Sequence, residues 1–531
     1  MTLFEGVETH VINRLTSREQ TIKKRFCYFN PLSLSNWPLV CPFCRYPYPP
    51  FQTIDAIVGP GMVGDVKALI AISLTIMLVL GCGGFQHSTQ KSASIFDVEV
   101  VASPRVTVTQ RAGITGGGYP VIAGDRILNF HPYHPDDFGI SKGIGSAIST
   151  DGGLHWTKGR DDWPMTEMVD LWVQRFKNGD LFAFGIKWVP APESRRNAKL
   201  PNVPNDAYQI GISKDDGKNW KLERARIDCP PELGGIVRPL AHIIERENGM
   251  LLMPAYVWKK AGNKVVLLQS EDGGRLWKVR SLITTSLAMI KAGARVASPW
   301  FETSISQTKD GELLAIIRTG STVKSNLVSV RSTDHGKTWG KPKVLLFAGK
   351  LPTLHLLNNG VLTVTTALSR NHCRVYLSHD GTGRKWSRAF VISSQTGGNV
   401  GTAIAGKDKL ILTTPANRRI DAWQLRVGPK PVPTESLNPP TNLNFEKGTL
   451  TWTPSANAVA YRVTPVLIKP GPLYTTTLVL PYAAIHTPDN SPNLNLGRQL
   501  LLGSTYVFDI AALDAKGRMS PAMRSQKFQL R

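Results

Sequence analysis

Short segments of alternating apolar and polar residues recur through the middle of the chain, and five of them end in the same polar turn. The turn reads Ser-x-Asp-x-Gly-x-x-Trp and occupies residues 149–156, 213–220, 270–277, 332–339 and, one residue longer, 378–386. The alternation predicts half-buried strands, the Asp side chain supplies acceptors for loop N–H groups, and Gly tolerates a positive φ. Each copy therefore predicts a β-hairpin, and its aspartate is interpreted as structural rather than catalytic.

The spacing of these turns predicts the fold. Successive turn aspartates (Asp151, Asp215, Asp272, Asp334 and Asp380) are 46 to 64 residues apart, the length of one four-stranded propeller blade. A second repeat, a Gly turn followed by an apolar strand, occurs at Gly124, Gly179, Gly249, Gly311, Gly360 and Gly406. Six such hairpins predict an all-β, six-bladed β-propeller over residues 105–428. The last blade lacks the polar turn, and we expect its outer strand to come from the start of the domain, around VEVVASPRVTV.

The C-terminal part has a different pattern. Residues 429–438 form a Pro-rich linker, and residues 439–531 resemble a fibronectin type III domain in their Pro-Pro start, Leu-x-Trp strand and Gly-x-x-Tyr-x-Phe-x-Ile-x-Ala end. The length fits a small β-sandwich. We expect a separate C-terminal β-sandwich whose role is spacing or attachment.

The N-terminal part contains an export signal. Residues 62–82 have a short leader, an apolar run of about 13 residues and a Val-Leu-Gly-Cys ending, which is too short for a membrane span and resembles a bacterial lipoprotein signal. The segment predicts a signal peptide with lipidation at Cys82, followed by a linker over 83–104. Residues 1–61 are interpreted as an extension from an upstream start codon. The predicted location is therefore exported and membrane-anchored, in the periplasm or at the cell surface.

The charge of the chain indicates an anionic partner. The net charge is +24, which is compatible with nucleic acid, a membrane or an acidic sugar. Because the basic residues are dispersed among strands and no nucleic-acid module is present, nucleic acid is excluded as a partner. The Cys41 and Cys44 pair lacks a second pair, so no metal site is predicted and no cofactor is expected.

The predicted topology indicates which residues surround the pocket of the propeller. If each Gly turn joins the first two strands of a blade, first strands begin and second strands end at one mouth, and the polar turns lie on the opposite face. Such a cluster of charged and polar side chains favours a site for a sugar carboxylate. The residues at these positions are Asp170, Arg238, Glu302, His131, His134, Asp136, Asp137, Lys187, Tyr256, Arg318, Arg370, Asn417 and Arg418.

Three stretches make the propeller similar to the sialidase (neuraminidase) family, whose Asp-box or BNR repeats match the polar turns. FETSISQTKDGELLAIIRTG resembles the family's Asn-Glu-Pro-Ser stretch and places its catalytic Glu at Glu302 and one arginine of its triad at Arg318. SRNHCRVYLSHDG resembles the stretch with another triad arginine, at Arg370. Asp137 precedes the turn Ser149 by 12 residues, in the loop where the family keeps its acid/base Asp.

The resemblance implies a glycoside hydrolase that removes a terminal sialic acid or related acidic sugar from a glycan. In the family, arginines bind the carboxylate, a Tyr is the nucleophile, a Glu takes its proton and an Asp protonates the leaving oxygen. Glu302 and Asp137 would then be catalytic. Arg318, Arg370 and Arg238 would bind the carboxylate, and the other pocket residues would be His131, Tyr133, His134, Asp170 and Tyr256.

Two positions depart from the family pattern. Gly118 stands where the family has its first triad arginine, and no Tyr occurs between Tyr376 and Tyr461, the region expected to supply the nucleophile. Arg111 and Arg238 are the alternatives for the arginine. Tyr119, Tyr133 and Tyr256 are the alternatives for the phenol. Carbohydrate binding without catalysis is the second hypothesis for the function, and a protein-binding scaffold is the third.

Overall fold

The computed structural model describes the chain from residue 98 onward, with gaps. It does not describe residues 1–97, 111–117, 133–143, 161–162, 164, 166–167, 188–207, 234–235, 240–241, 259–262, 298–299, 321, 323–324, 369–370, 394–397, 417–418, 431–432, 470–481, 488, 497–502 and 530–531. The predictions for residues 1–97, including Cys82, therefore lie outside the described residues. The chain divides into two compact units at Thr89 and Gln90, and the fold described below belongs to the second.

The described part of the chain is almost entirely β-structure, arranged first as successive antiparallel units of about four strands, of which the second and third are joined by parallel pairing of residues 226–228 with residues 276–278. Sheet one contains β3 (Tyr119–Ala123), β4 (Arg126–Pro132), β5 (Ile144–Ser149) and β6 (Thr157–Lys158). Sheet two contains β7 (Met168–Arg175), β8 (Leu181–Lys187), β9 (Tyr208–Ser213) and β10 (Lys221–Asp228). Sheet three contains β11 (Ile236–Pro239), β12 (Ile244–Glu245), β13 (Leu251–Trp258), β14 (Lys264–Ser270) and β15 (Leu276–Thr285). In sheet three, β11 and β12 both pair with β13, so its first strand is interrupted.

Three more units follow in the same order. Sheet four contains β16 (Thr303–Gln307), β17 (Leu313–Ile317), β18 (Asn326–Ser332) and β19 (Lys343–Ala348). Sheet five contains β20 (Lys350–Leu356), β21 (Leu362–Leu368), β22 (Asn371–Ser378) and β23 (Ala389–Ser393). Sheet six contains β24 (Gly401–Ile404), β25 (Lys409–Ala416) and β26 (Arg419–Pro429), and is completed by β1 (Val98–Ala102) and β2 (Val106–Gln110).

The two predicted kinds of turn are present, and both occur at the same end of the sheets. All six predicted turn glycines have positive φ and join the first and second strands, for example Gly311 with a φ of 85° between β16 and β17. The Ser-x-Asp turns join third and fourth strands. The two kinds of turn touch, because the N–H of Lys309 donates to the carbonyl of Gly381 at 3.0 Å. The aspartate turns therefore lie opposite the end where first strands begin, which we call the mouth end.

Side-chain hydrogen bonds explain why the turn motif has this composition. In the first copy, Oδ1 of Asp151 accepts from Ser149 Oγ at 2.8 Å and from the N–H of His155 at 2.9 Å, and Trp156 Nε1 donates to the carbonyl of Gly153 at 3.1 Å. In the second copy, hydrogen bonds from the backbone and side chain of Asn219 lower the pKa of Asp215 to about 2. The prediction that these aspartates stabilise turns is confirmed.

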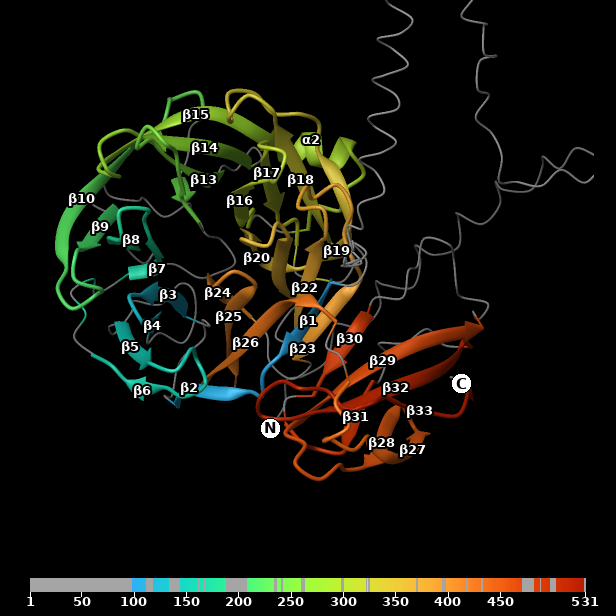
Figure 1. The fold of residues 1–531 in the computed structure, drawn as a ribbon. Helices are drawn as coiled ribbons and strands as arrows, with labels where there is room; N and C mark the ends of the chain where they lie inside the picture. The colour runs from blue at the N-terminus through green and yellow to red at the C-terminus, as the bar shows by residue number, and fades with distance from the viewer. Residues whose placement is uncertain are drawn as a thin grey trace, which may run out of the picture. The chain divides into compact units, whose positions relative to one another are not determined.

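The first strands surround a central axis, and the two ends of this region of the chain close the ring (Figure 1). Strand β24 contacts β3, β3 contacts β7, and β16 contacts both β13 and β20. Sheet six is closed by antiparallel pairing of β1 and β2 with β26, in which Val100 is opposite Val427 and Val106 is opposite Ala422. The expectation that the start of the domain supplies the outer strand of the last sheet is confirmed.

One short helix is present in the described residues. Helix α2 (Ser286–Lys291) follows β15, and Thr285 caps its N-terminus by accepting a hydrogen bond from the N–H of Ala288. Met289 anchors the helix in the core between sheets three and four. None of the helices in the described part of the chain has the length and apolar character needed to span a membrane.

The C-terminal strands form two further layers. One contains β27 (Thr441–Glu446), β28 (Thr449–Thr453) and β31 (Asn493–Asn495). The other contains β29 (Ala460–Lys469), β30 (Tyr482–His486), β32 (Thr505–Leu513), β33 (Met523–Arg524) and β34 (Phe528–Gln529). Between the layers, Trp452 packs edge-on against Tyr461 with ring centroids 5.0 Å apart.

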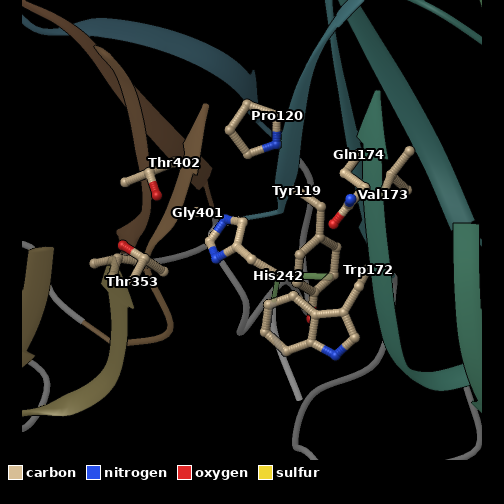
Figure 2. Close-up of a pocket in the computed structure, with 10 residues that line it drawn as sticks. Tyr119, Pro120, Trp172, Val173, Gln174, His242, Thr353, Gly401 and Thr402 are labelled. Atoms are coloured by element: carbon tan, nitrogen blue, oxygen red, sulfur yellow. The ribbon is translucent and has the colours of Figure 1, made fainter. Parts of the chain in front are cut away.

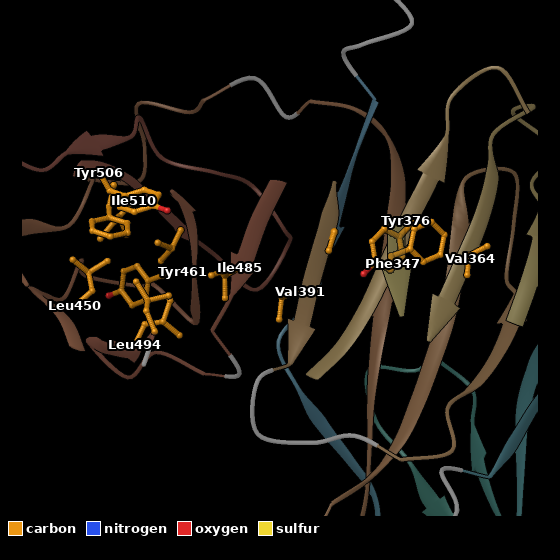
Figure 3. Close-up of a cluster of buried hydrophobic side chains, with 14 of the residues drawn as sticks. Phe347, Val364, Tyr376, Val391, Leu450, Tyr461, Ile485, Leu494, Tyr506 and Ile510 are labelled. Atoms are coloured by element: carbon orange, nitrogen blue, oxygen red, sulfur yellow. The ribbon is translucent and has the colours of Figure 1, made fainter. Parts of the chain in front are cut away.

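The C-terminal layers continue sheet five instead of standing apart from it. Strand β30 pairs in parallel with β23, with Ile485 opposite Val391. Figure 3 shows these two side chains between the aromatic group of Phe347 and Tyr376 and the C-terminal core around Tyr461. The expectation of a separate C-terminal sandwich does not anticipate this pairing, because strand partners this far apart in sequence leave no local signal.

The same region also contacts β1. Arg462 in β29 donates to Oε2 of Glu99 in β1 at 2.8 Å, and both side chains are largely buried. Beside this pair, Val101 packs with Ala460, Leu513 and other C-terminal residues. The strand that closes the ring is therefore covered by the C-terminal layers.

Candidate functional site

Two buried arginines at the mouth end of sheets three and four form the centre of the candidate site. Arg318 follows β17 at the point where this second strand ends, and Arg238 lies in β11, the first strand of sheet three. Both side chains are buried. Buried guanidinium groups require partners, and their planar forks suit the recognition of carboxylates. We call Arg238, Tyr256, Trp300, Glu302 and Arg318 the arginine cluster.

Glu302 holds Arg318 in place. Glu302 lies directly before β16, and its Oε1 accepts from Arg318 Nη1 at 2.5 Å. Its Oε2 accepts from the backbone N–H of Leu351, at the start of β20, at 2.8 Å. Arg318 Nε also donates to the carbonyl of Gly320 at 3.1 Å. The structure thus brings the predicted Glu302 and Arg318 into direct contact, and both carboxylate oxygens of Glu302 accept hydrogen bonds.

Tyr256 and Trp300 hold the second arginine. Arg238 is opposite Tyr256 in the pairing of β11 with β13, and its Nη1 donates to Tyr256 Oη at 3.1 Å. Its guanidinium carbon lies 5.3 Å from the centroid of the Trp300 ring, within the range of a cation–π contact. Tyr256 is only 1% exposed, so its ring packs in the core and its phenol accepts from Arg238.

Backbone strain accompanies the contact with Glu302. Leu351 has a φ of 40°, in the left-handed region that a non-glycine residue occupies at a cost of about 1 kcal/mol. The pairing of β20 with β21 shifts register between Lys350 and Thr353, and Thr366 Oγ1 donates to the carbonyl of Lys350 at 2.7 Å. This irregular strand start directs the Leu351 N–H at Glu302.

A narrow pocket opens on the axis of the ring, and Figure 2 shows the rings of Tyr119, Trp172 and His242 close together in it. Tyr119 and Trp172 meet edge-on with centroids 4.8 Å apart. The lining comes from sheets one, two, three, five and six. It consists of Tyr119, Pro120, Trp172, Val173, Gln174, His242, Thr353, Val400, Gly401 and Thr402.

Among the residues that the structure describes, the lining of the axial pocket is uncharged at neutral pH. Burial lowers the pKa of His242 to about 4, and burial next to His242 lowers the pKa of His355 well below its usual value. The ring centroids of His242 and His355 are 4.4 Å apart, and His355 Nε2 lies 2.7 Å from Thr402 Oγ1. Gln174 fixes the segment of His242 by exchanging two hydrogen bonds with the backbone of Ile243.

The pocket and the arginine cluster share two chain segments. Arg238 and His242 are four residues apart in the interrupted first strand of sheet three, and Leu351 and Thr353 both lie in β20. Two segments of the chain therefore contribute both to the pocket lining and to the arginine cluster or its contacts.

The position expected for the first triad arginine cannot hold a side chain. Gly118 has a φ of 80°, and a Cβ on it would lie 2.4 Å from Nδ2 of Asn129, which is itself fully buried. An arginine at this place would require the start of β3 to move. The absence of an arginine at Gly118, noted in the sequence, is therefore required by the backbone conformation and packing of sheet one.

The remaining predicted site residues are only partly described. His131 is buried in β4, and its Nδ1 lies 3.3 Å from the carbonyl of Asn129. Asp170 lies in β7, but its side chain is not described. The predicted residues outside the described ranges are Arg111, Tyr133, His134, Asp136, Asp137, Arg370, Asn417 and Arg418. Their roles stay predictions.

The sequence analysis did not identify Trp300, Leu351, Trp172 or His242. Trp300 could have been found from its position two residues before Glu302, because a first strand begins there. The contribution of Leu351 is a backbone N–H in an unusual conformation, which has no signature in the residue type. Within the described residues, no group of three or more His, Cys, Asp and Glu side chains is placed to bind a metal ion.

The match to a protein-family model agrees with the repeat pattern. A comparison with curated proteins found no match. Among solved structures, a Hadza microbial sialidase is similar with 15% identity and a TM-score of 0.48, covering 61% of this chain and 68% of its own. A Trypanosoma rangeli sialidase mutant displaying trans-sialidase activity has 13% identity and a TM-score of 0.43 over 77% of this chain and 86% of its own. A Penicillium chrysogenum alpha-L-arabinanase is similar with 13% identity and a TM-score of 0.42, covering 61% of this chain and 98% of its own. A protein-family model described as a BNR repeat-like domain matches residues 176–403.

Proposed function

We propose that this protein is a sialidase-like exo-glycosidase that removes sialic acid or a related acidic sugar from the end of a glycan. The observation that carries the proposal is the pair of fixed, buried arginines, Arg238 and Arg318, together with an axial pocket whose described lining carries no charged side chain. A sugar with one carboxylate matches both parts, because the carboxylate binds the guanidinium forks and the ring enters the pocket. In this proposal, sheets one to six are the blades of a six-bladed propeller and residues 439–531 are a fibronectin type III-like domain.

The chemistry requires an acid, and Asp137 is its proposed source. Asp137 is proposed to donate its proton to the leaving glycosidic oxygen as the bond to the anomeric carbon breaks, and Arg318, Arg238 and Arg370 are proposed to bind the carboxylate. Glu302 is proposed to position Arg318 and to accept a proton from a phenol. Tyr119 is the phenol among the described residues that lines the pocket.

One observation favours carbohydrate binding without catalysis as the second function. Both oxygens of Glu302 accept hydrogen bonds, from Arg318 and from Leu351. These contacts give Glu302 a structural role that requires no proton transfer. A binding protein needs the arginines and the pocket, but it has no use for the acid at Asp137.

The discriminating experiment measures hydrolysis and binding with the same purified chain. The full chain is incubated with a fluorogenic sialoside and with a panel of uronic acid and neutral glycosides. We expect hydrolysis of an acidic glycoside, and a loss of about 100-fold or more in Asp137→Asn with ligand affinity retained. The exposed Asp125→Asn variant, in a Gly turn at the opposite end, is the matched control. Binding of an acidic glycan with no turnover of any glycoside would establish the second function.

A further inference from the structure

Helix α2 presents an exposed apolar side next to the mouth end of the ring. Met289 is buried between sheets three and four with Val328 and Val344. Leu287 and Ile290, three residues apart and so on one side of the helix, are 59% and 52% exposed. Figure 1 shows α2 on the outside of the ring, beside β18. The helix is thus fixed by one residue and exposes two large apolar side chains.

A third leucine lies on the adjoining strand. In β19, Leu345 and Phe347 are buried in the core shared with sheet five, so alternation places Leu346 on the opposite face, the face of Val344. This is the face of sheet four that Met289 of α2 packs against. Leu346 is 82% exposed. Leu287, Ile290 and Leu346 are defined here as the docking face.

Only basic charges accompany the docking face in the sequence. No Asp or Glu occurs between Asp272 and Glu302, and Lys291 and Arg295 lie in this segment at the end of α2 and just after it. No Asp or Glu occurs between Asp334 and Asp380 either, the segment that contains β19. Lys291 in α2 and Arg295, four residues further on, are exposed.

We propose that the docking face binds the surface of a bilayer rich in anionic phospholipid. Protruding Leu and Ile side chains gain free energy by entering the boundary between headgroups and acyl chains, and each nearby Lys or Arg adds attraction to an anionic surface. An acidic protein surface would pair the charges but would not need apolar side chains that project from a short helix. This proposal is independent of lipidation at Cys82 and of the proposed hydrolysis.

The location of the docking face has a consequence for access to the site. Strand β15 ends and β16 begins at the mouth end, so α2, which connects them, lies at the same end as Glu302. Contact through α2 would hold the mouth close to the bilayer. Glycans attached at a membrane surface are then the ones within reach.

The first test is flotation of the full chain, carrying Cys82→Ala, with vesicles. We expect binding to vesicles of phosphatidylcholine with about one third phosphatidylglycerol, and a much weaker association with phosphatidylcholine alone. Leu287→Ser combined with Ile290→Ser should lower the apparent affinity by about 10-fold or more while the melting temperature stays near that of the wild type. Ile468→Ser, which removes an apolar side chain that is 44% exposed in β29, is the matched control.

Hydrogen exchange locates the contact in case another segment also binds lipid. Anionic vesicles should slow amide exchange in residues 286–295 and 343–348 and leave the Ser-x-Asp turns unchanged. Equal vesicle binding by the double serine variant, or unchanged exchange in these two segments, would overturn the proposal. A concentration-dependent dimer that disappears in the double variant would instead assign the docking face to a second copy of the chain.

Discussion

The backbone N–H of Leu351 donates to Oε2 of Glu302, and this contact joins the start of sheet five to the carboxylate that holds Arg318. Glu302 thereby connects three segments: its own strand start, the end of β17 and the start of β20. A strained residue that supplies one of two hydrogen bonds to this half-buried carboxylate indicates that the position of Glu302 matters.

Glu302→Gln should therefore affect both stability and ligand binding. The variant leaves the buried Arg318 without its counter-charge, so we expect a loss of about 1–3 kcal/mol in the free energy of unfolding and weaker binding of an acidic sugar. Thermal denaturation and calorimetric titration check the two effects. Glu446→Gln, at an exposed position of β27, should change neither. A variant with wild-type binding but lost turnover would show that Glu302 acts in proton transfer alone.

Replacing either arginine of the cluster should reduce the affinity for an acidic sugar. Arg318→Ala removes a guanidinium that is already fixed by Glu302, and the loss of a charge-assisted pair is expected to cost about 2–4 kcal/mol of binding. Arg238→Ala should have a similar effect, whereas Arg524→Ala, in an exposed pair with Asp509, should have none. Affinities are measured with a sialoside and with its neutral counterpart. Equal losses for both ligands would point to disturbed folding.

The buried histidines predict acid sensitivity well above the pH at which carboxylates titrate. Burial lowers the pKa of His242 to about 4, so below pH 6.5 the unfolded chain binds a proton that the folded chain does not. Stability should fall as the pH decreases from about 6.5 to 4, by about 3 kcal/mol from His242 alone. Melting temperatures across this range measure the effect, and His242→Gln should flatten the curve. A melting temperature that rises toward pH 4 would contradict the assignment.

The buried pair of Glu99 and Arg462 should contribute to the stability of the closed ring. Glu99→Ala leaves a buried guanidinium unpaired, and we expect a loss of about 2–4 kcal/mol in the free energy of unfolding. Combining Glu99→Leu with Arg462→Met removes both charges and should restore most of the stability. Denaturant titration measures both variants. Glu446→Ala, from an exposed pair with Lys447, should change stability by less than about 0.5 kcal/mol.

Lipidation at Cys82 is a prediction about the N-terminal segment. In bacterial cells, Cys82→Ala should move the protein from the detergent fraction to the aqueous fraction after phase separation, without a change in its melting temperature. A weaker association through the docking face would persist in the variant and should decrease at high salt, because exposed charge interactions are screened. Identical partitioning of wild type and variant would argue against a lipoprotein.

Turn chemistry is the part of the fold that the sequence predicted well. Each Gly turn and each Ser-x-Asp turn depends on residues within a few positions, so residue types such as Gly311 and Asp215 are sufficient to predict it. The pairing of β1 with β26 was predictable because the sequence of the last blade has no Ser-x-Asp turn and therefore lacks an outer strand of its own. The pairing of β23 with β30 was not, because edge strands choose distant partners by shape and available hydrogen bonds.

The candidate site was predicted at the level of strand ends but not at the level of contacts. Glu302 and Arg318 follow from a motif and from the topology. The role of Leu351 as a donor depends on a φ of 40°, and a side chain is excluded at Gly118 because a Cβ there would lie 2.4 Å from Asn129 Nδ2. Neither is encoded in residue spacing. Both arise from the way neighbouring strands pack.

The closure of sheet six by β1 and β2 determines when the protein can finish folding. Ser103 and Gln424 share a hydrogen bond across 321 positions of the chain, so during synthesis β1 has no partner until almost the whole propeller has been made. Contacts of such long sequence separation form slowly, and until then the first strand and β26 are unpaired edges. If the predicted export signal at residues 62–82 is used, this delay keeps the ring open, so the chain can cross the membrane before the ring closes.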